Sequence, residues 1–554
     1  MPKASWKVAA IDKSKAKRLE YGLGLSALVS RVLVSRGLHD EQAARCFLEP
    51  SLGDLHDVFL LPDIEPAVER LVHAVTNDDH IVVLGHDDVD GITATTIVFG
   101  SLREIGADTT YYIPDSPTEG LGLTNRLVDR FKKTGAKLII TVDCGISNKE
   151  AIAYAKSQGI DTIVTDHHEP PDQLPDAVGV VDAKRHDSTY GFRDLAGCGV
   201  AFRFMQGFAE RYRQVAGPPS LDGMLGMAAL GSYADRVPLV GENRVLVAHG
   251  VKDLLHRRLV PFSVLKSHIW VDEDSTMSEV LSKIMPILGS ARSDEGGNLG
   301  CELLLSDHEE DAEEILSSLV MECERRKEKS RRTLERVREA VASAANDSHK
   351  LVVLVQEHLP SKTVGYCTSK IAEDLYKPVV IISMKADIGV GEARGPKGVD
   401  LVGALNANSS YLLGFGGHKA AAGFSIERSK VDAFKEALVA YFDEHLDPAV
   451  IRKEIAIDAK SDPSDLTVVN LKSLLCLEPF GEENRKPVFL LENLDAGMIK
   501  KIDGTLRLGE IGLSGDALAS ESAIDPHEKL SLVVSPFADG SLRFVDVIDW
   551  KKGK

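Results

Sequence analysis

Three short apolar runs, each followed by polar residues, set the pattern of the chain between residues 80 and 185. The runs occupy residues 81–84, 138–142 and 161–164 and are rich in β-branched side chains. Stretches with helical spacing of apolar residues come between them, from about 93 to 105 and from about 148 to 158. This alternation of strand and helix predicts a parallel, doubly wound α/β sheet.

The remaining segments predict further parts on either side of this sheet. Residues 1–75 have mainly helical patterning, and we expect them to pack on a core domain of residues 76–305. Residues 306–347 contain neither Gly nor Pro and predict one connecting helix, of which the last 37 residues alone would span roughly 55 Å. A smaller α/β domain follows at 348–445. Short alternating segments at 446–554 predict a small β-barrel.

The composition is that of a globular protein with an acidic balance. Of 554 residues, 44% are hydrophobic and 27% are charged, and the formal net charge is -19. This balance argues against a protein that coats polyanions, although a local basic groove would still bind nucleic acid. Seven scattered cysteines without paired spacing indicate reduced thiols. We find no signal-like or membrane-spanning apolar stretch, so we expect a cytoplasmic protein without a membrane partner.

Acidic and histidine side chains follow the ends of the predicted strands and of one later helix. Because the carboxyl ends of parallel strands meet at one edge of a sheet, we expect these side chains to converge. Carboxylates with a few imidazoles suit Mn²⁺, or else Mg²⁺, and two such ions would support hydrolysis of a phosphate ester. An acid from a central strand, such as Asp143, is the natural bridge. The set is His86, Asp88, Asp90, Asp143, Asp166, His167, His168 and Asp235.

Each of these motifs alone also has a structural interpretation. A single Asp after a strand is more often a helix cap or turn former than a metal ligand. Adjacent histidines such as His167 and His168 are structural about as often as they are ligands. Four motifs in this order, each behind a strand or helix end, favour a site for two metals.

The four motifs resemble the signature of the DHH phosphoesterases. Further segments resemble the RecJ family of bacterial single-strand-specific 5′→3′ DNA exonucleases: residues 36–50, 195–202, 414–424 and 477–489. The resemblance implies a DHH catalytic domain with a doubly wound parallel sheet and a long connecting helix. It also implies a smaller α/β DHH-associated domain (DHHA1 type) that binds substrate, and a C-terminal OB-fold barrel that binds nucleic acid.

The resemblance also implies a role for each residue of the metal set. His86 and Asp88 would hold one ion, and Asp90 and His167 the other. Asp143 and Asp235 would be shared between the two ions. His168 would contact the scissile phosphate or the leaving oxygen, while Asp166 would orient the histidines rather than bind metal.

Candidate substrate-binding residues lie in three further segments. Glycines and cations in one segment could hold a phosphate, and the resemblance assigns DNA phosphates to two arginines in the others. Two departures from the family pattern, Glu392 beside Arg394 and Ser116 in place of an arginine, weaken the expectation of a 5′-phosphate preference. The candidates are Gly416, Gly417, His418, Lys419, Arg394 and Arg292.

The connecting helix carries cations at helical spacing, with Arg325, Lys329, Arg332 and Arg336 on one face. Two interpretations stay open: a solvated face with i,i+4 partners such as Glu328, or a basic wall for a nucleic-acid backbone. The aromatics of the C-terminal barrel are few, and core packing would explain them as well as stacking on bases.

From these features we expect a monomeric exonuclease that hydrolyses single-stranded DNA 5′→3′ and releases mononucleotides in recombination and repair. A helicase and a single-strand-binding protein are possible partners. One alternative is a phosphodiesterase of short oligoribonucleotides or cyclic dinucleotides. Another is a replication scaffold without catalysis, although such a protein would not need the complete set of metal ligands.

Overall fold

The chain forms two compact units in the computed structural model. We call them the larger unit (Val8–Cys323 with Ile457–Lys554) and the smaller unit (Met1–Lys7 with Glu324–Ala456). The structure describes residues 4–115, 119–256, 259–269, 275–289, 298–344, 349–503, 505–515, 527–537 and 543–552.

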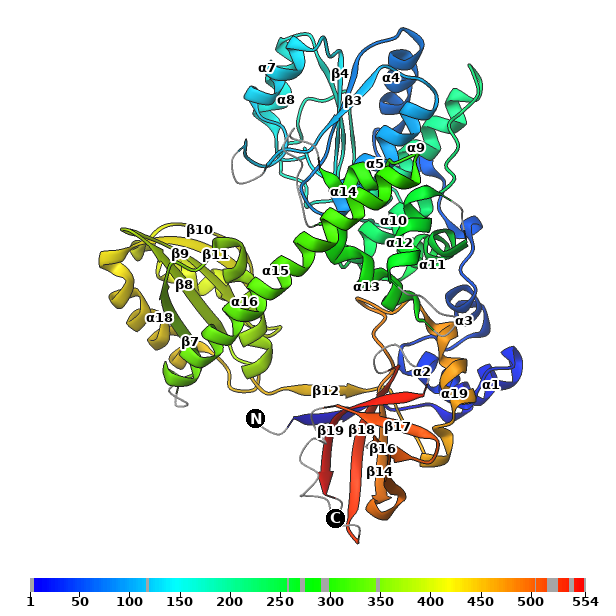
Figure 1. The fold of residues 1–554 in the computed structure, drawn as a ribbon, viewed down its shortest axis with the longest axis vertical. Helices are drawn as coiled ribbons and strands as arrows, with labels where there is room; N and C mark the ends of the chain where they lie inside the picture. Colours follow the sequence, from blue (N-terminus) through cyan, green and yellow to red (C-terminus); the bar gives the residue numbers. More distant parts are fainter. Residues whose placement is uncertain are drawn as a thin grey trace. The chain divides into compact units, whose positions relative to one another are not determined.

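A five-stranded parallel sheet with strand order β3-β2-β4-β5-β6 lies in the larger unit (Figure 1). All residues of β2 and β4 are buried, so these strands appear in the sequence as continuous apolar runs. The doubly wound sheet expected from the sequence is confirmed. The strands are β2 (Ile81–Leu84), β3 (Thr109–Tyr112), β4 (Leu138–Val142), β5 (Asp161–Thr165) and β6 (Gly179–Val181).

Helices cover both faces of this sheet (Figure 1). Ile81 and Val83 of β2 face the cluster that includes α4, α5 and α9, whereas Val82 and Leu84 face α7 and α8. The alternation follows from the two-residue period of a strand. The helices are α4 (Ile64–Thr76), α5 (Val89–Glu104), α7 (Asn125–Lys133), α8 (Lys149–Ser157) and α9 (Gly197–Tyr212).

The order of the strands reverses between β2 and β4. Strand β3 follows β2 along the chain but pairs on one side of it, whereas β4 pairs on the other side. Helix α5, which follows β2, and helix α8, which follows β4, lie on opposite faces. In open α/β sheets, ligands bind outside the carboxyl ends of strands at such a switch point. The segments that contain His86 and Asp143 begin there.

A helical region follows the sheet. Helix α10 packs against α5 and α9, and its last turn delivers Asp235 to the sheet edge. The helices after α9 are α10 (Met224–Ala234), α11 (Gly241–His256), α12 (Val260–Ile269), α13 (Met277–Leu288) and α14 (Leu299–Leu304).

The first N-terminal helices pack elsewhere than we expected, since we expected residues 1–75 to pack on the domain of the parallel sheet. Leu19 and Leu33 share a hydrophobic cluster with Phe489 and Leu532 of the C-terminal sheet. Of the helices before residue 76, α4 and the short 3₁₀ helix at Val58–Leu60 contribute to the core of the parallel sheet. Helical periodicity identifies an apolar face but not its partner. These helices are α1 (Lys13–Leu23), α2 (Ala27–Ser35) and α3 (Glu41–Leu48).

The C-terminal region contains a seven-stranded, mainly antiparallel sheet with order β13-β14-β18-β19-β17-β16-β15. Phe537 is fully buried and stacks on Phe480, with ring centroids 5.8 Å apart, so it serves the core. The strands are β13 (Ala459–Lys460), β14 (Phe489–Asp495), β15 (Ile499–Ile502), β16 (Thr505–Leu508), β17 (Ile511–Ser514), β18 (Lys529–Pro536) and β19 (Phe544–Lys552); α19 (Val468–Ser473) precedes β14.

The smaller unit is built on a mixed sheet with strand order β10-β11-β9-β8-β7. Helices α17 and α18 pack on one face, and α16 packs with the end of α15 on the other. A separate pair joins β1 (Ser5–Val8) to β12 (Glu454–Ile457). The elements are β7 (Val352–Glu357), α16 (Ser361–Leu375), β8 (Val379–Lys385), β9 (Ile388–Arg394), α17 (Leu401–Ala407), β10 (Leu412–His418), β11 (Ala421–Glu427) and α18 (Val431–His445).

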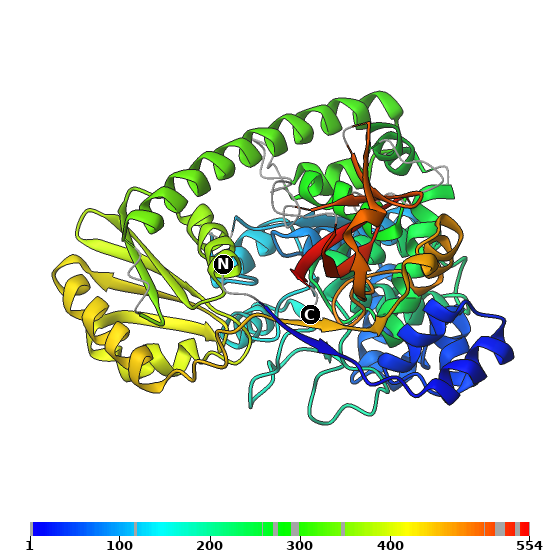
Figure 2. The same ribbon diagram turned by 90° about the horizontal axis from the view of Figure 1, so that it is seen from below.

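The connecting helix α15 (Glu309–Ala344) is continuous over 36 residues, about 54 Å at 1.5 Å per residue (Figure 2). It begins in the larger unit and ends in the smaller one. Leu334, Val337 and Val341 pack against α16, so the apolar face predicted from the sequence is buried. The cations predicted for the other face are exposed.

The seven cysteines are all free, in agreement with the reduced thiols expected from their spacing. Five are buried, and Cys46 and Cys476 are exposed. Among the described helices, none combines the length and the apolar character needed to cross a bilayer.

A buried carboxyl group joins the C-terminal region to α13. Glu478 is 8% exposed, and its Oε2 accepts a hydrogen bond of 3.0 Å from the backbone N–H of Met277. Its Oε1 has no hydrogen-bond partner. Burial raises the pKa of Glu478 from 4.5 to about 7. The folded protein therefore prefers the protonated carboxyl.

We predict that this group makes stability fall as pH rises. Its folded-state pKa lies above the unfolded value, so its contribution is complete below pH 4.5 and is lost between pH 4.5 and 7. At 1.36 kcal/mol per pKa unit the loss is about 3 kcal/mol. Glu478→Gln should match the wild type in urea unfolding at pH 5 and exceed it at pH 8. Glu482→Gln, an exposed control, should show no such gain; an equal gain in both variants would contradict the assignment.

Candidate metal centre

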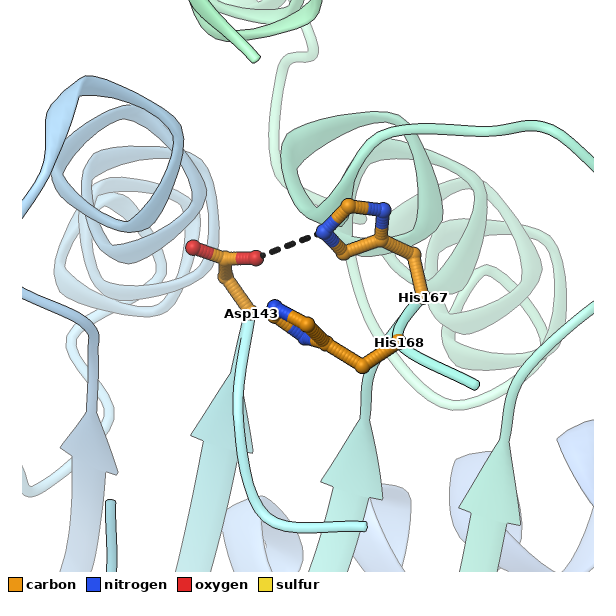
Figure 3. A group of neighbouring side chains, drawn as sticks. All are labelled: Asp143, His167 and His168. Carbon is orange, nitrogen blue, oxygen red and sulfur yellow. Dashed lines mark ion pairs between the residues drawn. The ribbon is translucent and has the colours of Figure 1, made fainter. Parts of the chain in front are cut away.

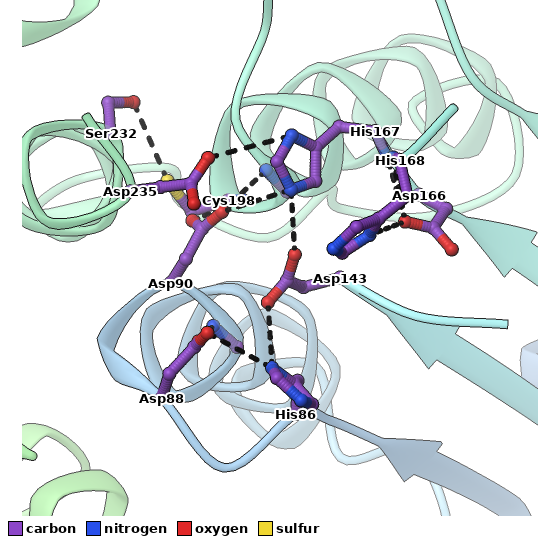
Figure 4. A network of polar contacts seen from close by, with 12 residues as sticks. His86, Asp88, Asp90, Asp143, Asp166, His167, His168, Cys198, Ser232 and Asp235 are labelled. Atoms are coloured by element: carbon purple, nitrogen blue, oxygen red, sulfur yellow. Dashed lines mark hydrogen bonds and ion pairs between the residues drawn. The ribbon is translucent and has the colours of Figure 1, made fainter. Parts of the chain in front are cut away.

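The predicted ligands converge at the carboxyl edge of the parallel sheet (Figure 4). His86 follows β2, Asp143 follows β4, and His167 follows β5. Asp235 directly follows the last residue of α10. Three groups of possible ligands result: a first with His86, Asp88 and Asp143, a second with Asp90, His167 and Asp235, and a third with Asp143, His167 and His168, which shares Asp143 with the first and His167 with the second.

In the first group, an imidazole lies between two carboxylates. His86 Nδ1 is 3.0 Å from Asp88 Oδ2 and 3.7 Å from Asp143 Oδ2. The hydrogen bond to Asp88 raises the pKa of His86. Burial opposes ionisation of Asp88, but the contacts with His86 and the N–H of Gly91 act together against it, and the pKa of Asp88 is lowered. Asp88 also caps helix α5, because its Oδ1 accepts 2.9 Å from Gly91 N–H. The capping interpretation and the ligand interpretation therefore apply to the same side chain.

In the second group, His167 lies between two acids. Its Nε2 is 3.8 Å from Asp90 Oδ2, and its Nδ1 is 3.7 Å from Asp235 Oδ2. Burial lowers the pKa of His167, so the ring favours the neutral form that metal ligation requires. Burial, followed by the charges of Asp90 and Asp88, raises the pKa of Asp235 to about 7. Among the described residues Asp235 groups with Asp90 and His167, and its sharing between the two ions stays a prediction.

Asp143 belongs to more than one group. Its Oδ2 faces His86, and its Oδ1 is 3.1 Å from His167 Nε2. The carboxyl is 1% exposed, and neither oxygen has a hydrogen-bond partner. Burial, followed by the charges of Asp90 and Asp88, raises its pKa well above the usual range. Its backbone φ of 57° lies in the left-handed region, which is costly for a residue other than glycine.

Asp166 is fully engaged in orienting its neighbours. Its Oδ1 accepts from His167 N–H at 2.7 Å and from His168 N–H at 3.2 Å, and it lies 2.7 Å from His168 Nδ1. Its Oδ2 accepts from Ile146 N–H at 2.9 Å. These contacts support the prediction that Asp166 orients the histidines rather than binding metal.

His168 lies beside Asp143 and below His167 in Figure 3. Its side chain is 56% exposed, whereas that of His167 is 9% exposed. The hydrogen bond to Asp166 raises the pKa of His168 and fixes Nδ1 toward that acid. Nε2 is thereby left on the other side of the ring.

Two glycines allow the acids to lie this close to the helices. A Cβ on Gly197 would lie 2.5 Å from Asp143 Oδ1, and one on Gly231 would lie 2.6 Å from Asp90 Oδ1. The N–H of Gly197 also donates to Asp90 Oδ2 at 2.7 Å, at the N-terminus of α9. Sequence reasoning missed Gly231. Its only signal was a glycine inside a helical stretch, four residues before Asp235.

The arrangement fits a pair of divalent cations. Unpaired buried carboxylate oxygens are costly unless a cation neutralises them, and both oxygens of Asp143 are in this state. His167 Nδ1 is also buried without a hydrogen-bond partner. Carboxylates with two imidazoles form a donor set that suits Mn²⁺ or Mg²⁺. Asp143 belongs to the first group and lies 3.1 Å from His167 of the second.

The predicted substrate residues that the structure describes belong to the smaller unit. Arg394 ends β9 and pairs in register with Ala421, which pairs with His418 of β10. The two cationic positions are therefore at one end of the sheet, roughly 10 Å apart across two strand spacings. Arg394 Nη1 lies 2.8 Å from Glu392 Oε2. Arg292 and Ser116 lie outside the described residues.

The glycine-rich segment differs from the phosphate-holding turn that we expected. Gly416, Gly417 and His418 lie within β10, and only Lys419 and Ala420 form the turn. Gly417 has φ of 135°, and a Cβ there would lie 2.5 Å from the carbonyl oxygen of Ala421. Gly416 borders open space. The glycines thus form an exposed strand surface next to His418.

Comparisons with known proteins agree with this organisation. Residues 80–232 match the model of the DHH family N-terminal domain, residues 348–444 the DHHA1 domain, and residues 457–514 the RecJ OB domain. RecJ of Salmonella typhimurium, named a single-stranded-DNA-specific exonuclease, is 30% identical over 84% of this chain and 83% of its own length. The chain belongs to the RecJ family. RecJ of Bacillus subtilis is 31% identical over 90% of this chain, which spans 63% of that protein's length.

Solved structures of the family support the same fold. A crystal structure of RecJ in complex with Mn²⁺ from Thermus thermophilus matches with a TM-score of 0.81 at 26% identity, covering 99% of this chain and 80% of that one. A structure of exonuclease RecJ bound to manganese matches with a TM-score of 0.60 at 29% identity, covering 71% of this chain and 98% of that one. The expected α/β architecture with a C-terminal OB domain is thus established.

We predict that metal-free protein is destabilised by Asp143. Asp143→Asn removes an unpaired buried carboxylate and should stabilise the metal-free protein by about 1–3 kcal/mol in thermal unfolding. Saturating Mn²⁺ should stabilise the wild type by about 3 kcal/mol at a hundredfold excess over Kd, and the variant by much less. Asp129→Asn, an exposed control in the same unit, should respond like the wild type. Equal Mn²⁺ responses in all three proteins would contradict a metal role for Asp143.

Proposed function

We propose that this protein is a single-strand-specific 5′→3′ DNA exonuclease that uses two divalent metals, Mn²⁺ or else Mg²⁺, and releases mononucleotides. The observation that carries the proposal is the buried Asp143 carboxylate, which two ligand groups share at the switch point of the sheet. Membership of the RecJ family supports it, as do the manganese-containing relatives. We assign the role to DNA recombination and repair.

The residues of the site divide into metal holders and positioning residues. His86 and Asp88 would hold one ion and Asp90, His167 and Asp235 the other, with Asp143 between them. When bound, such a pair supplies Lewis acidity that lowers the pKa of water and neutralises charge developing on a phosphate. His168, oriented through Nδ1 by Asp166, presents Nε2 to a phosphate or leaving oxygen. Asp166 serves as the positioning residue.

We place the substrate contacts in the smaller unit on Arg394, His418, Lys419 and the exposed backbone of Gly416 and Gly417. Arg292 belongs to the same proposal from sequence alone. The ion pair between Glu392 and Arg394 occupies part of the guanidinium that a terminal phosphate would otherwise engage. We therefore propose that this protein depends little on a 5′-phosphate.

Other functions receive less support. A phosphodiesterase of dinucleotides or short oligoribonucleotides would not require the C-terminal OB domain. A scaffold without catalysis would not require the converging ligands. We further propose that the protein acts as a monomer in the cytoplasm, where its DNA substrate and reducing conditions coincide, alongside a helicase and a single-strand-binding protein.

The activity is tested by end-labelled substrates with Mn²⁺. We expect mononucleotides from the 5′ end of single-stranded DNA, much slower cleavage of duplex ends, and at least a hundredfold loss of kcat/KM in Asp143→Ala. Asp129→Ala should retain full activity. Preferential cleavage of a dinucleotide would favour the phosphodiesterase alternative, and inactivity of the wild type on all substrates would favour the scaffold.

Substitution of Glu392 tests the proposal that this protein depends little on a 5′-phosphate. Glu392→Ser should free Arg394 and shift preference toward 5′-phosphorylated over 5′-hydroxyl strands by about tenfold in KM, equivalent to about 1.4 kcal/mol. Glu373→Ser, which removes a carboxylate paired with Lys370 on α16, serves as the control. A 5′-phosphate preference in the wild type that Glu392→Ser leaves unchanged would refute this role.

A further inference from the structure

A basic groove lies in the smaller unit between α15 and the start of α16. Its volume is about 440 Å³. Arg325, Lys329, Arg332 and Arg336 line one side from successive turns of α15, and His358 with Pro360 lines the other. The buried side chains of Thr333 and Leu359 form part of the lining. All these residues belong to one compact unit.

One of these cations, Arg332, is paired with a carboxylate of the groove itself. Glu328, the one carboxylate among the described lining residues, accepts from Arg332 Nε and lies 2.9 Å from Arg331 Nε. Arg332 therefore has the i,i+4 partner that the solvated-face interpretation predicted. Glu328 is thereby engaged with Arg332 and Arg331, rather than with Lys329 or Arg336. With His358 counted as neutral, the lining holds an excess of three positive charges on a protein of net charge -19.

The start of α16 adds to the positive potential of the groove. Pro360 precedes this 15-residue helix and has no side-chain group that could cap it. Peptide dipoles place a partial positive charge at a helix N-terminus. The lining contains no Phe, Tyr or Trp among the described residues, so it offers no aromatic platform for bases. Its chemistry is thus that of a site for phosphate groups without base recognition.

We propose that this groove binds backbone phosphates of the nucleic-acid strand, through Lys329 and Arg336. This inference rests on the proposed function, because it assigns a second substrate contact to the nuclease. Binding there is independent of sequence and sensitive to salt, since it releases counterions from the strand. The groove contacts phosphates that do not react, so it contributes to KM and leaves kcat unchanged.

Equilibrium binding of a labelled thirty-residue oligothymidylate to the full chain in EDTA tests the inference without hydrolysis. In Lys329→Ala/Arg336→Ala, affinity should fall by roughly five- to twentyfold at low salt. The slope of log K against log salt should fall by about 1.4, since each phosphate contact on a single strand contributes about 0.7. Both changes place alanine on an exposed helix face, which preserves helix propensity.

A charge-matched control and a neutral strand sharpen the test. Lys385→Ala/Lys435→Ala removes two exposed charges of the same unit outside the groove. Its affinity for the strand and its slope of log K against log salt should stay near the wild-type values. A methylphosphonate strand should bind the wild type and the groove variant equally. Losses in the control as large as in the groove variant would overturn the inference. So would unchanged oligonucleotide affinity combined with weakened binding of thymidine monophosphate, because the groove would then serve free phosphates.

Hydrolysis with Mn²⁺ distinguishes this inference from the proposed function. The groove variant should raise KM for single-stranded DNA with unchanged kcat, whereas Asp143→Ala should lose kcat and retain strand binding. If the wild type hydrolyses no strand, the proposed function fails, while the binding data in EDTA still decide whether the groove holds backbone phosphates. A groove variant with normal affinity and normal salt slope refutes the inference even if the nuclease activity is confirmed.

Discussion

The buried carboxylate of Asp143 is the constraint around which the larger unit is organised. It lies between His86 and His167 with no hydrogen-bond donor on either oxygen, on a left-handed backbone that few side chains tolerate. Such a group is unfavourable in a fold by itself, because its charge is desolvated and other acids surround it. A buried carboxylate at the switch point of the sheet is stable when bound cations neutralise its charge.

The neighbouring structure is arranged to hold acids together without collapse. The N-terminus of α9 donates to Asp90, and the cap of α5 uses one oxygen of Asp88. Asp166 makes three contacts with His167 and His168 and accepts a fourth from the N–H of Ile146, in the loop after Asp143. Each of these contacts places a hydrogen-bond donor or the positive end of a helix dipole against a carboxylate. This lowers the electrostatic repulsion between the neighbouring carboxylates. The smaller unit contains cationic side chains in the groove beside α15 and at the end of β9.

Local signals in the sequence predicted much of the fold and of the site. Buried parallel strands leave continuous apolar runs, and turn geometry places acids and histidines directly after them, so β2, β4 and β5 and their ligands were identifiable. Local signals did not predict contacts between residues that are distant in sequence. The packing of α1 to α3 with the C-terminal sheet and the contact of Gly231 with Asp90 both join segments more than a hundred residues apart. Glu392 and Arg394 are two residues apart on β9, but the sequence did not show that they form an ion pair, because the pair depends on how the strand lies in the sheet.

The sequence by itself determined the types of ligand, their order along the chain and the doubly wound sheet that carries them, because these follow from short-range periodicity and residue chemistry. Tertiary structure alone decided that Asp143 lies between His86 and His167 and that Asp235 lies beside His167. Those outcomes depend on distances of a few ångströms between segments far apart in sequence, and periodicity along one chain contains no information about such distances.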